Sequence, residues 1–314
     1  MTILQWIKHF KFMTSPMFLF LVASVVLGII LIIKANNELT MRAFSIVLGS
    51  LILVYLSFFV GTLKKNPTSL RIGLVGLPGS GKTVFLSVLF NEIQVQQKDR
   101  VEFQPYGRET IEEVARNLNI LASGQWLPPT ESGVVFPFRA NVRVTGGLFP
   151  KRYTVEIGDY AGEHTKEFDS SSEQWLHRTK YFEYIIDSDV LFLAIDGETL
   201  IESSTSETER MQNNLVAALQ VLLEKKGVQP GRKTSMPIAV LILKADRLKT
   251  KEVEDFSTAK IDRILTICKN RCLKSEVFFV SSVGSVTEGG SPPKEIHPVN
   301  VCEPMIWAMR AVAS

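Results

Sequence analysis

A glycine-rich octapeptide, flanked by a strand pattern and a helix pattern, constrains the fold more than any other feature of the sequence. The β-rich apolar run at residues 70–75 predicts a strand, and residues 83–94 predict a helix. The loop between them matches G-x-x-x-x-G-K-[ST] in full. It consists of Gly76, Leu77, Pro78, Gly79, Ser80, Gly81, Lys82 and Thr83. Backbone N–H groups of such a loop turn toward phosphate oxygens, and the helix N-terminus adds positive potential. The sequence therefore predicts a phosphate-binding loop.

Two side chains of this loop, and a carboxylate downstream, predict a magnesium site beside the phosphates. Lys82 is expected to reach the β- and γ-phosphates, and Thr83 to offer its hydroxyl to Mg²⁺. Asp159 follows a strand pattern and begins a D-x-x-G sequence that ends at Gly162. A carboxylate at a strand end, followed by a glycine N–H that can meet the γ-phosphate, is typical of nucleotide switches. Taken alone, D-x-x-G is equally consistent with a simple turn.

The order of strand and helix patterns predicts an α/β fold. Strands are expected at residues 70–75, 134–144, 153–157, 190–195, 238–243 and 277–280, and helices at 83–94, 110–123, 207–226, 251–271 and 304–312. The turn-rich residues 145–150 predict a hairpin between the second and third strands. The other strands alternate with helices, which requires parallel crossovers. We expect a doubly wound, mostly parallel sheet with one antiparallel edge.

With these motifs in this order, residues 71–283 resemble the translation-factor and Ras-like class of P-loop GTPases. Within that class the chain looks most like the bacterial double-GTPase group, in which a Trp/Pro-rich segment ending in Thr precedes the second strand. Residues 124–130, Gly-Gln-Trp-Leu-Pro-Pro-Thr, fit that segment. The resemblance implies that GTP or GDP binds with Mg²⁺. It also implies that Thr130 is the switch I threonine that completes Mg²⁺ coordination in the triphosphate state, although an ordinary loop threonine is the alternative.

Two further segments resemble the base-reading loops of that class. Residues 243–246, Leu-Lys-Ala-Asp, resemble N-K-x-D with leucine in place of asparagine. The Asp246 carboxylate would accept hydrogen bonds from guanine N1–H and the 2-amino group, and adenine offers neither donor. Lys244 would lay its aliphatic stem over the base. Because Leu243 lacks the amide of the family motif, weaker guanine affinity is expected. The second segment, which resembles the S-A-K loop whose backbone N–H groups meet the base oxygen, is Ser281, Ser282 and Val283.

The residues after the switch glycine predict slow hydrolysis. Glu163 stands where a water-orienting glutamine is usual, and a carboxylate facing the γ-phosphate is repelled unless it is protonated. His164 could position the water instead, or be a solvated histidine with no role. No arginine precedes Thr130 closely enough to act as an internal finger. We therefore expect a protein partner to supply the missing cation.

Two uncharged apolar runs, residues 17–33 and 43–63, predict a transmembrane hairpin. Each is about long enough to cross a hydrocarbon core of ~30 Å as a helix, the first only just so. A cleaved signal peptide followed by a buried core helix is the alternative. Five cations flank the pair and two lie between the runs, which predicts that both ends are cytoplasmic. The flanking cations are Lys8, Lys11, Lys64, Lys65 and Arg71, and the inner ones are Lys34 and Arg42. The predicted domains are a membrane anchor with an interfacial segment, residues 1–65, and a P-loop domain, residues 66–314.

Net charge and cysteine content limit the classes of partner and ligand that the sequence indicates. A net charge of +3 is too small to indicate nucleic acid, and the cations beside the hairpin suit anionic membrane lipid. The three cysteines have no histidine near them and are expected to be reduced thiols, not metal ligands. A GTP-dependent membrane switch and a non-hydrolysing, nucleotide-stabilised membrane scaffold both fit the sequence. An ATPase-like domain of a secretion-system membrane protein fits less well, because adenine would gain nothing from Asp246.

Overall fold

A mixed sheet forms the centre of the second of two units into which the chain divides. The computed structural model describes residues 48–49, 67–95, 101–129, 135–145, 150–160, 180–248, 258–287 and 290–313. The units are Met1–Asn66 and Pro67–Ser314. Among the described residues, no helix is long and apolar enough to span a membrane. The predicted transmembrane runs lie outside the described residues apart from residues 48–49, so the hairpin stays a prediction.

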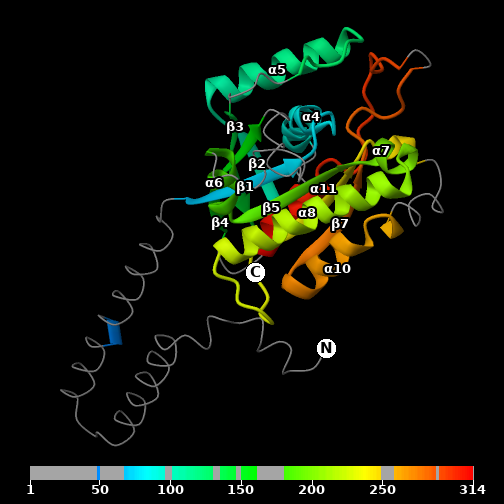
Figure 1. Ribbon diagram of the computed structural model, residues 1–314. Coiled ribbons are helices and arrows are strands. Elements are labelled where there is room, and N and C mark those ends of the chain that lie inside the picture. Colours follow the sequence, from blue (N-terminus) through cyan, green and yellow to red (C-terminus); the bar gives the residue numbers. More distant parts are fainter. Residues whose placement is uncertain are drawn as a thin grey trace, which may run out of the picture. The chain divides into compact units, whose positions relative to one another are not determined.

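The described strands of the second unit form one seven-stranded sheet in the order β2-β3-β4-β1-β5-β6-β7. β4, β1, β5, β6 and β7 are parallel, whereas β3 is antiparallel to both β2 and β4 (Figure 1). The strands are β1 Thr68–Gly76, β2 Val101–Pro105, β3 Val135–Val144, β4 Lys151–Tyr160, β5 Val190–Asp196, β6 Ile238–Leu243 and β7 Ser275–Val280. The predicted α/β class, hairpin and parallel core are confirmed. β2, which the sequence analysis missed, makes the antiparallel edge two strands wide.

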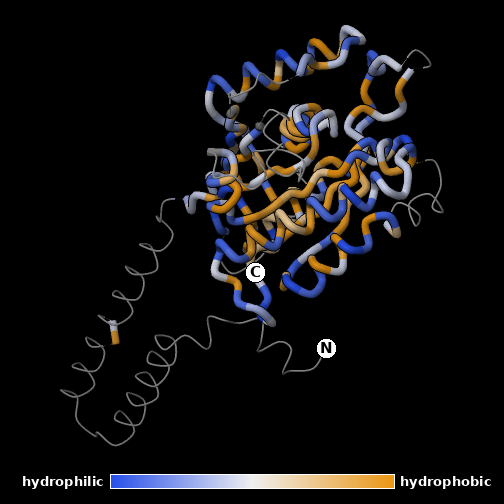
Figure 2. The backbone as a smooth tube through the Cα atoms, viewed as in Figure 1, coloured by the Kyte–Doolittle hydropathy of each residue, from blue (hydrophilic) through white to orange (hydrophobic). Residues whose placement is uncertain are grey.

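Helices cover both faces of the sheet because successive strand residues point to opposite sides. On β5, Phe192 packs into one core with α4 and α11, whereas Leu191 and Leu193 pack into the other with α6, α8 and α10. In Figure 2 the central strands are mostly hydrophobic. The helices are α4 Lys82–Val95, α5 Arg108–Ala122, α6 Lys180–Ile186, α7 Gly197–Glu202, α8 Thr205–Lys225, α10 Asp262–Arg271 and α11 Glu303–Ala313, with a short 3₁₀ turn at Ala245–Arg247.

Helix α5 packs against α4. The spacing of its apolar residues predicts one packed face, and Val114 and Leu121 are indeed buried. The Asn117 side chain donates a hydrogen bond to Ser87 Oγ on α4 at 2.9 Å. Ile111, predicted to share the packed face, is 55% exposed, so that prediction is wrong. The buried face instead starts at Thr110.

Candidate functional site

The glycine-rich loop joins the end of β1 to the first turn of α4, and the geometry explains its glycines. At Gly76 a Cβ atom would lie 2.5 Å from the carbonyl oxygen of Ala194 on β5, so only glycine allows this close approach. Gly79 and Gly81 have φ values of 73° and 89°, in the region that favours glycine. The loop therefore turns back over the start of α4, with Leu77, Pro78 and Ser80 between the glycines.

The Lys82 side chain folds back onto the loop. Its ammonium donates to the carbonyl oxygens of Gly76 at 2.8 Å and Leu77 at 2.9 Å. Burial lowers the Lys82 pKa to about 8, although the nearby Asp159 carboxylate opposes the shift. An ammonium that is buried and held by neutral carbonyl groups would gain from an anionic partner, because charge-assisted hydrogen bonds are stronger.

Asp159 lies near the end of β4 and meets the loop. Burial raises its pKa to about 6, whereas a hydrogen bond with the Thr83 side chain and the charge of Lys82 oppose that shift. The structure thus brings together Lys82, Thr83 and Asp159, three of the residues predicted to hold phosphate and Mg²⁺.

Two buried oxygen atoms at this place, Ser80 Oγ and Asp159 Oδ1, have no hydrogen-bond partner among the residues that the structure describes. Buried polar atoms are nearly always paired, so such atoms need an explanation. Mg²⁺ takes oxygen ligands, with one or two carboxylates and the phosphates of a substrate among them. A carboxylate with an unpaired oxygen beside a threonine hydroxyl and a buried ammonium therefore fits a magnesium–nucleotide complex.

The base-reading segments also meet, at the ends of β6 and β7. Ser281 Oγ donates to Asp246 Oδ1 at 2.8 Å and accepts from the backbone N–H of Gly284 at 3.0 Å. Ser282 and Val283 continue the same loop, and the Val283 carbonyl accepts from the N–H of His297 at 3.0 Å. The Asp246 carboxylate is thereby oriented before any base is present.

Comparison with known proteins decides the family. A family model described as Double-GTPase 2 matches residues 70–299, which is most of the chain and includes every loop described above. The chain belongs to the Double-GTPase 2 family. It is a GTP-binding protein of the P-loop GTPase class, as the sequence resemblance implied.

No curated protein matches the sequence. Among solved structures, the chain is similar to translation elongation factor SelB from Methanococcus maripaludis in complex with the GTP analogue GppNHp. The identity is 12% and the TM-score 0.39, and the match covers 80% of this chain and 35% of that one. The chain thus spans about a third of SelB.

This Double-GTPase 2 chain departs from N-K-x-D at Leu243. The residue after it, Lys244, contacts two carboxylates that the sequence did not predict. Leu243 is buried in the core, and Lys244 adopts a left-handed backbone with φ 56°. The Lys244 ammonium donates to Asp196 at 2.7 Å and to Glu198 at 3.3 Å. Burial would lower the Lys244 pKa, yet these carboxylates raise it above its ordinary value.

Gly197, which lies between Asp196 and Glu198 in the sequence, allows β5 and β6 to approach closely here. A Cβ atom at Gly197 would be 2.7 Å from the Leu243 carbonyl oxygen. The end of β5 therefore supports the base-reading loop. A carboxylate–Gly–carboxylate sequence at a strand end was the available signal.

Four of the predicted site residues lie outside the described residues: Thr130, Gly162, Glu163 and His164. The described chain reaches residue 129 on one side and Tyr160 on the other. Their roles in switching and hydrolysis stay predictions.

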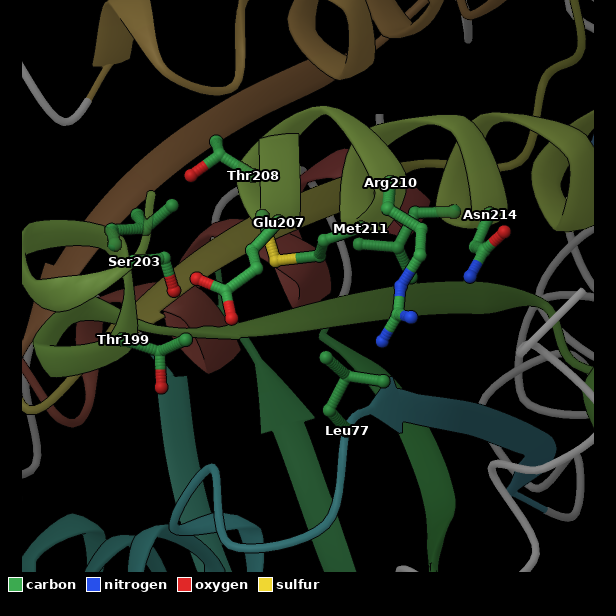
Figure 3. Close-up of a pocket in the computed structure, with 10 residues that line it drawn as sticks. Leu77, Thr199, Ser203, Glu207, Thr208, Arg210, Met211 and Asn214 are labelled. Carbon is green, nitrogen blue, oxygen red and sulfur yellow. The ribbon is translucent and has the colours of Figure 1, made fainter. Parts of the chain in front are cut away.

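A cavity of 220 Å³ borders the P-loop on the side of α7 and α8. Its lining includes Leu77 of the loop, Ser203, and Glu207, Arg210 and Asn214 of α8. Figure 3 shows the Arg210 guanidinium turned toward Leu77. The Glu207 side chain is engaged at the helix start, where it accepts from the Ser204 backbone N–H at 2.9 Å. Nothing in the helical pattern of α8 had predicted this cavity.

Proposed function

We propose that this chain is a membrane-anchored GTP switch that hydrolyses GTP slowly and depends on a protein partner for fast turnover. The observation that carries the proposal is the juxtaposition of two half-sites on one sheet edge. One half holds a buried ammonium and an unpaired carboxylate oxygen suited to magnesium and phosphate. The other holds a carboxylate oriented by Ser281 for guanine donors.

The residues have distinct tasks in this proposal. Lys82 exchanges its two carbonyl partners for phosphate oxygens, which stabilises the charge of the β- and γ-phosphates. Thr83 and Asp159 would hold Mg²⁺, and Thr130 would join them in the triphosphate state. The bound metal would neutralise charge that develops on the phosphate oxygens. Asp246 would select guanine because guanine offers N–H donors to its carboxylate and adenine offers none.

Slow turnover is proposed from Glu163, which follows Gly162. Its carboxylate, if ionised, repels the γ-phosphate and orients water less well than an amide. The test is single-turnover hydrolysis by the full chain in detergent with GTP and Mg²⁺. We expect a rate on the order of 10⁻³ s⁻¹ or slower, the scale of unstimulated Ras-like turnover. Glu163→Gln should raise it, and an unchanged or lower rate would contradict this role.

The partner requirement has its own test, since Arg210 faces the P-loop across the cavity (Figure 3). If a partner supplies the missing cation, Arg210→Ala should leave the unstimulated rate within about twofold. A loss of more than about tenfold would instead mean that the chain carries its own cation. Arg232→Ala, an exposed arginine in a loop outside the cavity lining, is the matched control.

The membrane anchor is proposed from the two uncharged runs, with the P-loop domain and both chain ends in the cytoplasm and lipid as one partner. Deletion of residues 1–63 should release the protein from membranes and leave GDP affinity unchanged, because no proposed ligand group lies there. A fragment that folds but loses nucleotide would contradict the modular arrangement. Tight GTP binding with no phosphate release under any condition would favour the scaffold alternative.

A further inference from the structure

One hydrogen bond connects two segments that are far apart in the sequence. Trp126 Nε1 donates to the carbonyl oxygen of Gly290 at 2.8 Å across 164 positions of sequence. Trp126 follows α5 and precedes Thr130 by four residues. Gly290 belongs to the segment that follows the base-reading loop. Figure 1 shows the end of α5 beside this orange segment, on the α4 side of the sheet.

The Gly290 carbonyl is held in a turn with its own hydrogen bonds. The Gly290 N–H donates to the Thr287 carbonyl at 2.9 Å, and the Thr287 N–H donates to the Ser291 carbonyl at 3.0 Å. The Thr287 hydroxyl donates to that same carbonyl at 3.0 Å and accepts from the Ser291 N–H at 3.1 Å. The Thr287 side chain and the backbone together hold this turn. The Gly290 carbonyl, which accepts from Trp126, is therefore held in place by hydrogen bonds that do not involve Trp126.

Both ends of the segment are attached to the base-reading loop. Ser281 and Val299 exchange backbone hydrogen bonds at 3.1 and 2.8 Å, and His297 donates to Val283. Ser281 is also the residue that orients Asp246. The segment that contains Gly290 is thus hydrogen-bonded to the base-reading loop at His297 and Val299.

The Trp126 side leads to the phosphates. The Asn117–Ser87 bond ties α5 to α4, and α4 begins at Lys82 of the P-loop. These contacts link the P-loop, α4, α5, Trp126, Gly290 and the base-reading loop in that order. A nucleotide held by both the P-loop and Asp246 would close them into a ring, so that opening the ring and releasing the nucleotide would be coupled.

We propose that Trp126 is a positioning residue that slows nucleotide release by closing this ring. Its indole is 45% exposed, so the bond adds little buried area and can open without unfolding the core. The role concerns nucleotide retention and does not depend on how fast GTP is hydrolysed, on a membrane or on a partner.

The test measures release of fluorescent mant-GDP from the full chain after addition of excess GDP. Trp126→Phe keeps an aromatic ring but removes the N–H donor. We expect release to become roughly 2- to 5-fold faster, the lower part of the range for one hydrogen bond because the bond is exposed. Thr287→Val, which removes the hydroxyl bonds of the turn, should also speed release. Ile111→Ala, an exposed apolar residue on the same helix α5, should leave the rate unchanged.

The double variant separates a ring from two unrelated surface effects. If Trp126 and Thr287 act through one contact, Trp126→Phe/Thr287→Val should release mant-GDP no faster than the faster single variant, whereas independent sites would multiply their effects. Thermal unfolding of the nucleotide-free chain should not change with Trp126→Phe. Wild-type release by Trp126→Phe, multiplied rates, or an equal loss of nucleotide-free stability would each overturn the proposal. A wild-type chain that binds no mant-GDP would overturn nucleotide binding together with it.

Discussion

The phosphate side and the base side of the site differ in how their polar groups are paired. On the phosphate side, Ser80 Oγ and Asp159 Oδ1 are buried with no hydrogen-bond partner in the described part of the chain, and the Lys82 ammonium donates to two carbonyl groups. On the base side, Asp246 is bonded to Ser281, and Lys244 to two carboxylates. The phosphate side matches G-x-x-x-x-G-K-[ST] in full, whereas the base side departs from N-K-x-D at Leu243.

This difference assigns the two sides different contributions. Unpaired buried groups destabilise the free protein and gain most when a ligand arrives. Groups already paired gain less from the ligand but lose less orientation entropy on binding. The phosphate side should therefore dominate affinity, and the base side should set selectivity.

Lys82→Ala should have the largest effect on GTP affinity, because it acts on the phosphate side. It removes the ammonium from a cradle of backbone donors, so GTP affinity should fall by roughly 3 kcal/mol or more, about 100-fold. Isothermal titration calorimetry measures this loss. Lys233→Ala, which removes a lysine that bonds the Lys269 carbonyl, is the control. Retained affinity in the Lys82 variant would remove the P-loop from the account.

Asp246→Asn tests the base side. An amide in place of the carboxylate mismatches guanine and suits xanthine, which carries an oxygen where guanine has its 2-amino group. GTP affinity should fall by roughly 1–3 kcal/mol, while affinity for xanthosine triphosphate rises. Competition binding with both nucleotides gives the answer. A variant with no shift toward xanthine would mean that Asp246 does not contact the base.

Asp159 links the phosphate side to pH. Burial raises its pKa from 3.8 to about 6, so the folded, nucleotide-free protein binds a proton at Asp159 more tightly than the unfolded chain does. The stability contributed by protonation is present near pH 4 and is lost as pH rises through 6. Asp159→Asn should therefore stabilise the nucleotide-free chain by about 1–3 kcal/mol at pH 7. Urea denaturation at pH 5 and pH 7 checks this, and a destabilised variant at pH 7 would contradict it.

Ser281→Ala should have the smallest effect and sharpens the role of pairing. The variant leaves Asp246 without the donor that orients it, so GTP and GDP should both bind about 0.5–1.5 kcal/mol more weakly. Equal losses for the two nucleotides are expected because the γ-phosphate is not involved. Ser285→Ala, an exposed serine nearby, should bind like the wild type. Unchanged affinity in Ser281→Ala would show that orientation of Asp246 does not limit binding.

The sequence predicted best those parts of the fold whose signals are local. Strand, glycine loop and helix at residues 70–94 are contiguous, and the alternation of strands and helices sufficed for the parallel core. β2 was missed because Val-Glu-Phe-Gln-Pro is short and ends in proline, which reads as a loop. Helix α6 was missed in the same way, since seven residues carry little periodicity.

Pairings between distant residues could not be predicted. The carboxylates that hold Lys244 lie 46 and 48 positions away on another strand end, and the partner of Trp126 is 164 positions away. Such contacts depend on which strands are neighbours and on how the loops turn, and local sequence patterns determine neither. The meeting of Asp246 with Ser281 was foreseeable only through the family motifs.

Competition between GTP and ATP for the wild-type chain tests the central claim most directly. The claim is that Asp246, oriented by Ser281, selects guanine even though Leu243 replaces the asparagine of the family motif. Displacement of mant-GDP should require at least about tenfold less GTP than ATP, the ratio expected from about 1.4 kcal/mol of selectivity. If ATP displaces the probe as well as GTP does, residues 243–246 do not read the base, and the chain is a P-loop protein of undefined nucleotide preference.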